Sequence, residues 1–107
     1  MGLLTGIVRL VYLKQKQLTL QYKVQQLSTA KMHVSEKAVN LVTIGNDLEP
    51  DSPEYKTLEA RKQKLHMMEK RMERELTRHR TLLKMVDAEI KSAQKIVDSS
   101  IKSQFTY

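Results

Sequence analysis

One short segment interrupts an otherwise continuous helical pattern: Gly45-Asn46-Asp47-Leu48-Glu49-Pro50-Asp51-Ser52-Pro53. Gly45 fits the left-handed position just past the end of a helix. Ser52 fits an N-cap, and Pro53 fits the first helical position, where its missing N–H is tolerated. The segment therefore predicts an acidic turn over residues 45–52, with Gly45, Pro50, Ser52 and Pro53 as its turn residues.

On both sides of this turn, apolar residues recur every three or four positions, as expected of helices that bury one face. The pattern predicts a first helix over about 3–44 and a second over about 53–103. The row of the first helix, in which Gln17 is a polar exception, is Leu3, Ile7, Leu10, Leu20, Val24, Leu27, Val34, Ala38 and Leu41. The row of the second helix is Leu58, Leu65, Met68, Met72, Leu76, His79, Leu83, Val86, Ile90, Ala93, Val97, Ile101 and Phe105.

A short connection between long helices favours antiparallel neighbours. We therefore expect an all-α fold, a single helical-hairpin domain over residues 1–107 in which the two helices form an antiparallel coiled coil. The hairpin seam is predicted to place Leu20, Val24, Leu27, Val34 and Leu41 against Leu58, Leu65, Met72, Leu76 and Leu83.

The first helix carries a second apolar row near its start: Leu4, Val8, Val11, Tyr12, Leu18 and Tyr22. One hairpin seam cannot cover both rows of the same helix, so we expect assembly into a larger oligomer or filament through the second row. A C-terminal anchor of Ile101, Phe105 and Tyr107 completes the expected oligomer interface. The alternative is a terminal segment whose apolar residues fold back locally.

Composition removes several classes of function. The 107 residues include no cysteine, which excludes disulfides, cysteine-ligated metals and a thiol nucleophile. No glycine-rich phosphate loop, nucleophile elbow or His-Glu-x-x-His motif occurs. A cluster of His66, Met67, Met68, Met72 and Met85 has soft-metal chemistry, but methionines on a helical seam are ordinary core fillers. We expect no enzymatic activity, no cofactor and no metal.

Charge is distributed unevenly along the chain. The formal net charge is +5 for residues 1–45, −4 for 46–54 and +6 for 55–107, and residues 61–84 hold nine basic and three acidic side chains. Opposite charges at separate places favour an association in which the acidic turn of one copy meets the basic segment of another. Clustered basic residues also attract phosphate, so nucleic-acid binding is an alternative, although Glu69, Glu73 and Glu75 are interleaved among them.

The start of the chain carries a short apolar run. The apolar run Leu3 to Leu13 is interrupted by Arg9 and is far shorter than the ~20 residues of a membrane-spanning helix. It also lacks the basic start and the small-residue cleavage site of a secretory signal. We expect no membrane span and no cleavable signal, so the chain is either cytoplasmic or exported by a dedicated secretion system.

Two segments resemble those of small secreted helical-hairpin subunits, particularly type III secretion needle proteins. Glu49-Pro50-Asp51-Ser52-Pro53-Glu54 is similar to their proline-containing turn. Asp87-Ala88-Glu89-Ile90, continuing to Ile101-Lys102-Ser103-Gln104-Phe105, is similar to their C-terminal helix. The resemblance covers the second half of the chain. It implies export without a cleavable signal and helical polymerisation around a channel, with the C-terminal helix packed inside.

The sequence thus favours a non-enzymatic structural subunit whose partner is itself, with other secretion or assembly components as further partners. A first alternative is a small coiled-coil adaptor or secretion chaperone that binds a partner's helix with its second apolar row. The second alternative is a basic protein associated with nucleic acid.

Overall fold

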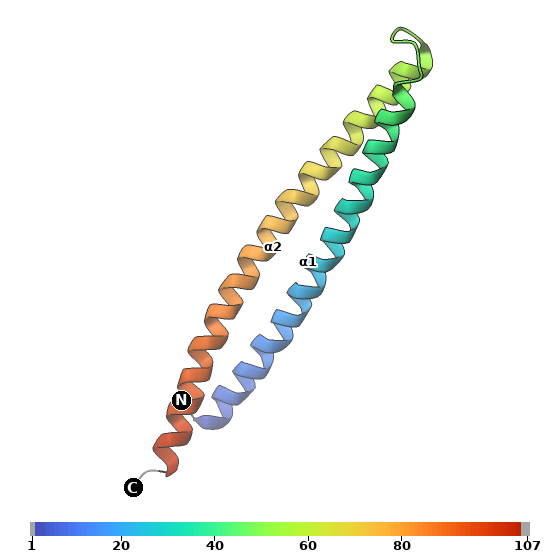
Figure 1. Cartoon of the computed structure of the whole chain (residues 1–107). Coiled ribbons are helices and arrows are strands. Elements are labelled where there is room, and N and C mark those ends of the chain that lie inside the picture. Colours follow the sequence, from blue (N-terminus) through green and yellow to red (C-terminus); the bar gives the residue numbers. More distant parts are fainter. Residues whose placement is uncertain (1, 106–107) are drawn as a thin grey trace. The chain divides into compact units, whose positions relative to one another are not determined.

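The computed structural model describes residues 2–105, which form two α-helices, α1 (Leu3–Gly45) and α2 (Pro53–Phe105). Figure 1 shows them running in opposite directions on either side of the turn at residues 46–52. No strand occurs in the part of the chain described. The predicted all-α helical hairpin is confirmed, and the helices end one and two residues later than predicted.

The start of α2 is capped as expected. The Ser52 hydroxyl accepts a hydrogen bond from the Tyr55 backbone N–H at 3.1 Å, and the Ser52 carbonyl accepts the Lys56 N–H at 3.2 Å. Pro53 is the first helical residue, and Glu54 lies in the first turn, where the helix dipole favours a negative charge. The hydroxyl thereby satisfies the Tyr55 N–H, which has no carbonyl partner within the helix, and the Lys56 N–H makes the first regular hydrogen bond of α2.

The prediction for Gly45 is wrong in its conformation. Gly45 is the last residue of α1 and does not have a positive φ. The helix end tightens instead, with the Asp47 N–H donating to the Ile44 carbonyl at 3.1 Å and the Leu48 N–H to the Gly45 carbonyl at 3.2 Å. A Cβ at this position would lie 2.7 Å from Leu58 Cδ2, so a larger residue here requires the Leu58 side chain to shift.

The described residues divide into two compact units, of which unit 1 comprises residues 2–24 and 78–105. Its core is formed by Leu10, Leu13, Ala93 and Val97, with Leu3 and Ile90 packed against them. The side-chain amide of Gln17 donates a 2.7 Å hydrogen bond to Asp87 Oδ1 across the two helices. The polar exception in the apolar row of the first helix therefore has a specific partner on α2.

Unit 2 comprises residues 25–77 and contains the turn. Its buried side chains are Val34, Leu58 and Leu76, and Leu76 is only 2% exposed. An ion pair between Lys31 Nζ and Glu73 Oε2 joins the two helices at the surface. In each unit the two helices are therefore joined by an apolar seam and by a polar contact across it.

Candidate self-association surface

The structure places all ten predicted seam residues on inward-facing positions. Leu20, Val34, Leu58 and Leu76 are buried, and the half-buried members are Val24, Leu27, Leu41, Leu65, Met72 and Leu83. Four members of the longer rows lie further out than predicted, because Ile7, Met68, Ile101 and Phe105 are exposed. Leu13, which was assigned to neither row, is 3% exposed and belongs to the core of unit 1.

The second row of the first helix faces solvent. Its six side chains are between 51% and 75% exposed, and we call them the α1 outer face: Leu4, Val8, Val11, Tyr12, Leu18 and Tyr22. By contrast, Leu10, Leu13 and Leu20 on the same helix are buried. At about 100° per residue, the centre of the α1 outer face lies roughly 175° around the helix from these buried residues. Within unit 1, α2 therefore covers the opposite side of α1.

The end of α2 presents a second exposed apolar surface in unit 1. Val97 is buried, and a Cβ on Gly6 would lie 3.2 Å from its Cγ2, so residue 97 is level with the first turns of α1. Ile101 and Phe105 follow at spacings of four on the same face of α2. In Figure 1 the end of α2 extends past the level at which α1 begins. Phe105 is 79% exposed, whereas Tyr107 lies outside the described residues.

A further exposed set on α2 was missed from the sequence. Leu82, Met85 and Ile96 lie in unit 1 and are each more than one-third exposed. Leu82 and Met85 are three residues apart, and Ile96 follows Met85 by eleven residues, about three helical turns, so the three side chains share one side of α2. That spacing is visible in the sequence, but it was obscured by the stronger row that forms the core.

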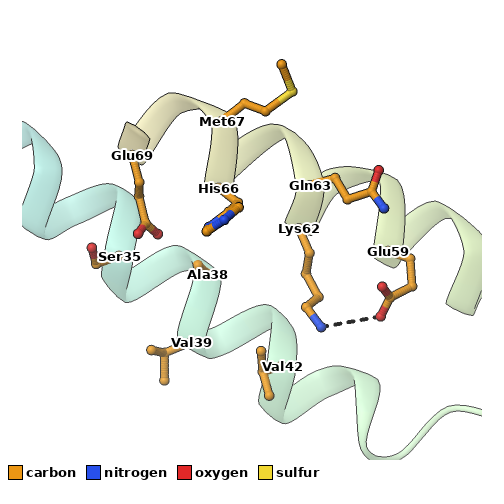
Figure 2. A pocket seen from close by; sticks show the side chains of 10 residues that line it. All are labelled: Ser35, Ala38, Val39, Val42, Glu59, Lys62, Gln63, His66, Met67 and Glu69. Carbon is orange, nitrogen blue, oxygen red and sulfur yellow. Dashed lines mark hydrogen bonds and ion pairs between the residues drawn. The ribbon is translucent and has the colours of Figure 1, made fainter. Parts of the chain in front are cut away.

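Unit 2 contains a groove on one side of the hairpin, with a volume of about 600 Å³. Ala38, Val39 and Val42 are its apolar lining residues on α1, and Figure 2 shows His66 and Glu69 pointing from α2 toward α1. At its edge, Lys62 Nζ lies 3.3 Å from Glu59 Oε1. The other lining residues are Ser35, Gln63 and Met67.

The titratable and methionine side chains of residues 2–105 are dispersed over the two helices and the turn between them. No group of three His, Asp or Glu side chains in residues 2–105 is placed to hold a metal ion. The Asp87 carboxylate is engaged by Gln17, and His33 Nδ1 lies 4.0 Å from Glu36 Oε2 on the exposed surface. Met67, Met68 and Met85 are exposed and Met72 is half-buried, so these four do not converge on one inward position.

Neither helix, over the residues described, combines the length and the apolar content needed to cross a bilayer. The surface of unit 1 exposes apolar side chains at the α1 outer face and at the end of α2, and a partner that contacts them would bury these side chains.

Comparison of the chain with protein-family models, with curated proteins and with solved structures gives no match.

Proposed function

We propose that this chain is a non-enzymatic structural subunit that self-assembles into an oligomer or filament through the α1 outer face. One observation carries the proposal: six large apolar side chains are exposed on the side of α1 that points away from α2 in unit 1. Scattered exposed apolar residues are normal on a protein surface. A contiguous row over several helical turns instead marks an interaction surface.

The area involved is sufficient for a stable interface. Side chains of this size that are half to three-quarters exposed leave roughly 100 Å² of accessible area each. Six of them supply about 600 Å² per copy, and two such faces bury about 1,200 Å², the lower end of the range for specific interfaces. Pairing of two copies through this face would therefore reach the size that such complexes need.

The apolar end of α2, Ile101 and Phe105, allows assembly beyond a pair. It lies at the end of α2, whereas the α1 outer face extends along the helix as far as Tyr22. A subunit with two separate apolar surfaces can contact two neighbours, and such contacts generate rings or open filaments. The acidic turn and the basic segment of α2 add a charge attraction between copies that depends on salt.

The resemblance to needle subunits supports the open, helical form of assembly and export by a dedicated secretion system. Features of this chain that agree with it are the hairpin of two long helices and the proline-containing turn. On this proposal, negative-stain microscopy of the purified chain reveals filaments. Small closed particles alone would contradict the filament form.

The experiment that tests the proposal replaces Val8 and Val11 together by Asp. Both side chains are exposed, so the hairpin keeps its helicity, while two buried carboxylates in the proposed interface prevent association. Sedimentation velocity should show a smaller species than the wild type, and circular dichroism should show unchanged helicity.

A matched control is available on the same helix. Val39 and Val42 are also exposed valines at a spacing of three, and they lie in unit 2. Replacing both by Asp should leave the assembly unchanged. If the two double variants sediment alike, the α1 outer face is not the interface and the proposal fails.

The groove of unit 2 favours a second candidate function, an adaptor or secretion chaperone that binds a partner's helix. An apolar wall with polar residues along its edge is the arrangement used to bind an amphipathic helix. This candidate is favoured if the wild type remains a monomer or dimer at all concentrations and a partner binds it. In that case the Val39→Asp and Val42→Asp double variant should lose the partner.

A further inference from the structure

The spacing of the α1 outer face indicates how this surface pairs with another helix. Five of its members, together with the exposed Gln15, occupy positions 4, 8, 11, 15, 18 and 22. The intervals alternate between four and three, which is the spacing of a coiled-coil seam. Tyr12 flanks this seam beside Val11. The outward side of α1 in unit 1 is therefore built to receive one further helix along its length.

The occupant that this seam fits is the same seam of a second copy. Reversing the order of the positions exchanges 4 with 22, 8 with 18, and 11 with 15, so each seam residue meets another seam residue when two copies pair antiparallel. No charged residue occupies any of the six positions. The area of about 1,200 Å² estimated for two such faces is that of a specific dimer.

Side-chain size favours the antiparallel orientation over the parallel one. In an antiparallel pair, Tyr22 lies against Leu4 and Leu18 against Val8, so large and small side chains alternate and the helices keep one separation. In a parallel pair, two Tyr22 side chains would meet at one end and two Val8 side chains near the other, and the distance between the helix axes would have to change along the seam. The antiparallel pair also opposes the helix dipoles.

Charge opposes this pairing only weakly. Residues 2–35 contain five basic and no acidic side chains, so pairing brings cations together. Arg9, Lys16 and Lys23 lie toward the edge of α1 that is away from the seam, and Lys14 alone flanks it. A single exposed pair of like charges is screened by salt and is small beside the burial of twelve apolar side chains.

We propose that two copies of this chain pair through an antiparallel, two-fold symmetric α1–α1 contact centred between positions 11 and 15. The inference rests on the proposed function, because it specifies how the α1 outer face is covered. A two-fold contact closes on itself, so growth beyond the pair uses the apolar end of α2.

The chain lacks cysteine, so introduced cysteines report this register directly. Leu4→Cys and Tyr22→Cys are made in separate chains that differ in mass through a tag, and the two are mixed under reducing conditions and then oxidised. In the antiparallel pair, positions 4 and 22 face each other, whereas two copies of position 4 lie about 27 Å apart along the axis. A disulfide requires Cα atoms within about 7 Å.

The expected result is a mixed Leu4→Cys and Tyr22→Cys disulfide, at ~10-fold or greater yield over the disulfide between two Leu4→Cys chains. The same mixture in denaturant gives the yield from random collision. Val8→Cys with Leu18→Cys repeats the test nearer the centre of the seam.

The outcomes separate the two proposals. A disulfide between two Leu4→Cys chains in native buffer shows a parallel pair, which overturns this register and leaves self-association standing. No disulfide above the denatured level in a wild-type-like assembly also overturns the register. A wild type that sediments as a monomer overturns the proposed function and the register together.

Discussion

The hydrogen bond from Gln17 to Asp87 offers a quantitative test of the seam in unit 1. It joins the two helices at 2.7 Å in a half-buried position. Hydrogen bonds to charged groups contribute about 1.5–3 kcal/mol to stability. Because Asp87 retains contact with water, we expect the lower end, a coupling free energy of about 1.5 kcal/mol in a double-mutant cycle of Gln17→Ala and Asp87→Ala.

A second double variant at the same two positions should raise the free energy of unfolding, whereas the alanine variants lower it. Replacing both residues by leucine removes the polar pair and extends the apolar core around Leu13 and Leu20, which are buried one turn on either side of Gln17. Replacement of a hydrogen-bonded pair by apolar groups of similar shape is neutral or stabilising. We expect the Gln17→Leu and Asp87→Leu double variant to be about 1 kcal/mol more stable than the wild type.

The assay is urea unfolding followed by circular dichroism at one fixed protein concentration, since self-association raises apparent stability. Gln94 and Asp98 form a matched control, because the same two side-chain types are joined at 3.0 Å on the exposed surface of α2. Their coupling should be only about 0.2–0.5 kcal/mol. A coupling for Gln17 and Asp87 no larger than that of the control would refute the reasoning.

Three further predictions concern the core, the cap and the end of α2. Leu13→Ala should destabilise the fold by about 2–4 kcal/mol in urea, whereas Leu4→Ala in a monomeric background should change stability by less than about 0.5 kcal/mol. Equal effects would place Leu13 outside the core. Ser52→Ala should lower stability by about 1 kcal/mol, and Ser52→Asp should restore it, because aspartate also caps; failure of Asp to restore it would exclude capping as the cause. Replacing Ile101 and Phe105 together by Asp should stop growth at a pair in sedimentation velocity, and assemblies of wild-type size would exclude this end as a contact.

The elements of the fold were predictable because their signals are local. Ser52 and Pro53 mark the start of α2 through capping and a fixed φ, which depend on neighbouring residues alone. The end of α1 was also placed to within one residue, but the role of Gly45 was misjudged. Gly45 stays helical and approaches the Leu58 side chain across the turn, and no local signal reports such an approach.

The details of the seam were harder to predict because they depend on pairing between helices. Leu13 was passed over because Gln17 breaks the apolar spacing that would have linked it to Leu20. In the structure Asp87 satisfies Gln17, and the row continues through both residues. Met68 and Ile101 follow the apolar spacing, yet they are exposed. For Ile101 the reason is that α1 begins near its level, a consequence of the unequal helix lengths.

The α1 outer face was predicted as a second row, and the structure places its six side chains in solvent. The sequence alone could not establish that exposure, since a terminal segment that folds back would have covered the same residues. The alternation of intervals of four and three through Gln15 can be read from the sequence. Burial of Leu10 and Leu13 in the core places the α1 outer face on the side of α1 that points away from α2 in unit 1.

Sedimentation equilibrium of the wild-type chain over a wide concentration range tests most directly whether copies of this protein cover one another's apolar faces. The account predicts a mass that rises with concentration from 12.4 kDa to at least twice that value. A constant mass of 12.4 kDa at every concentration would contradict it.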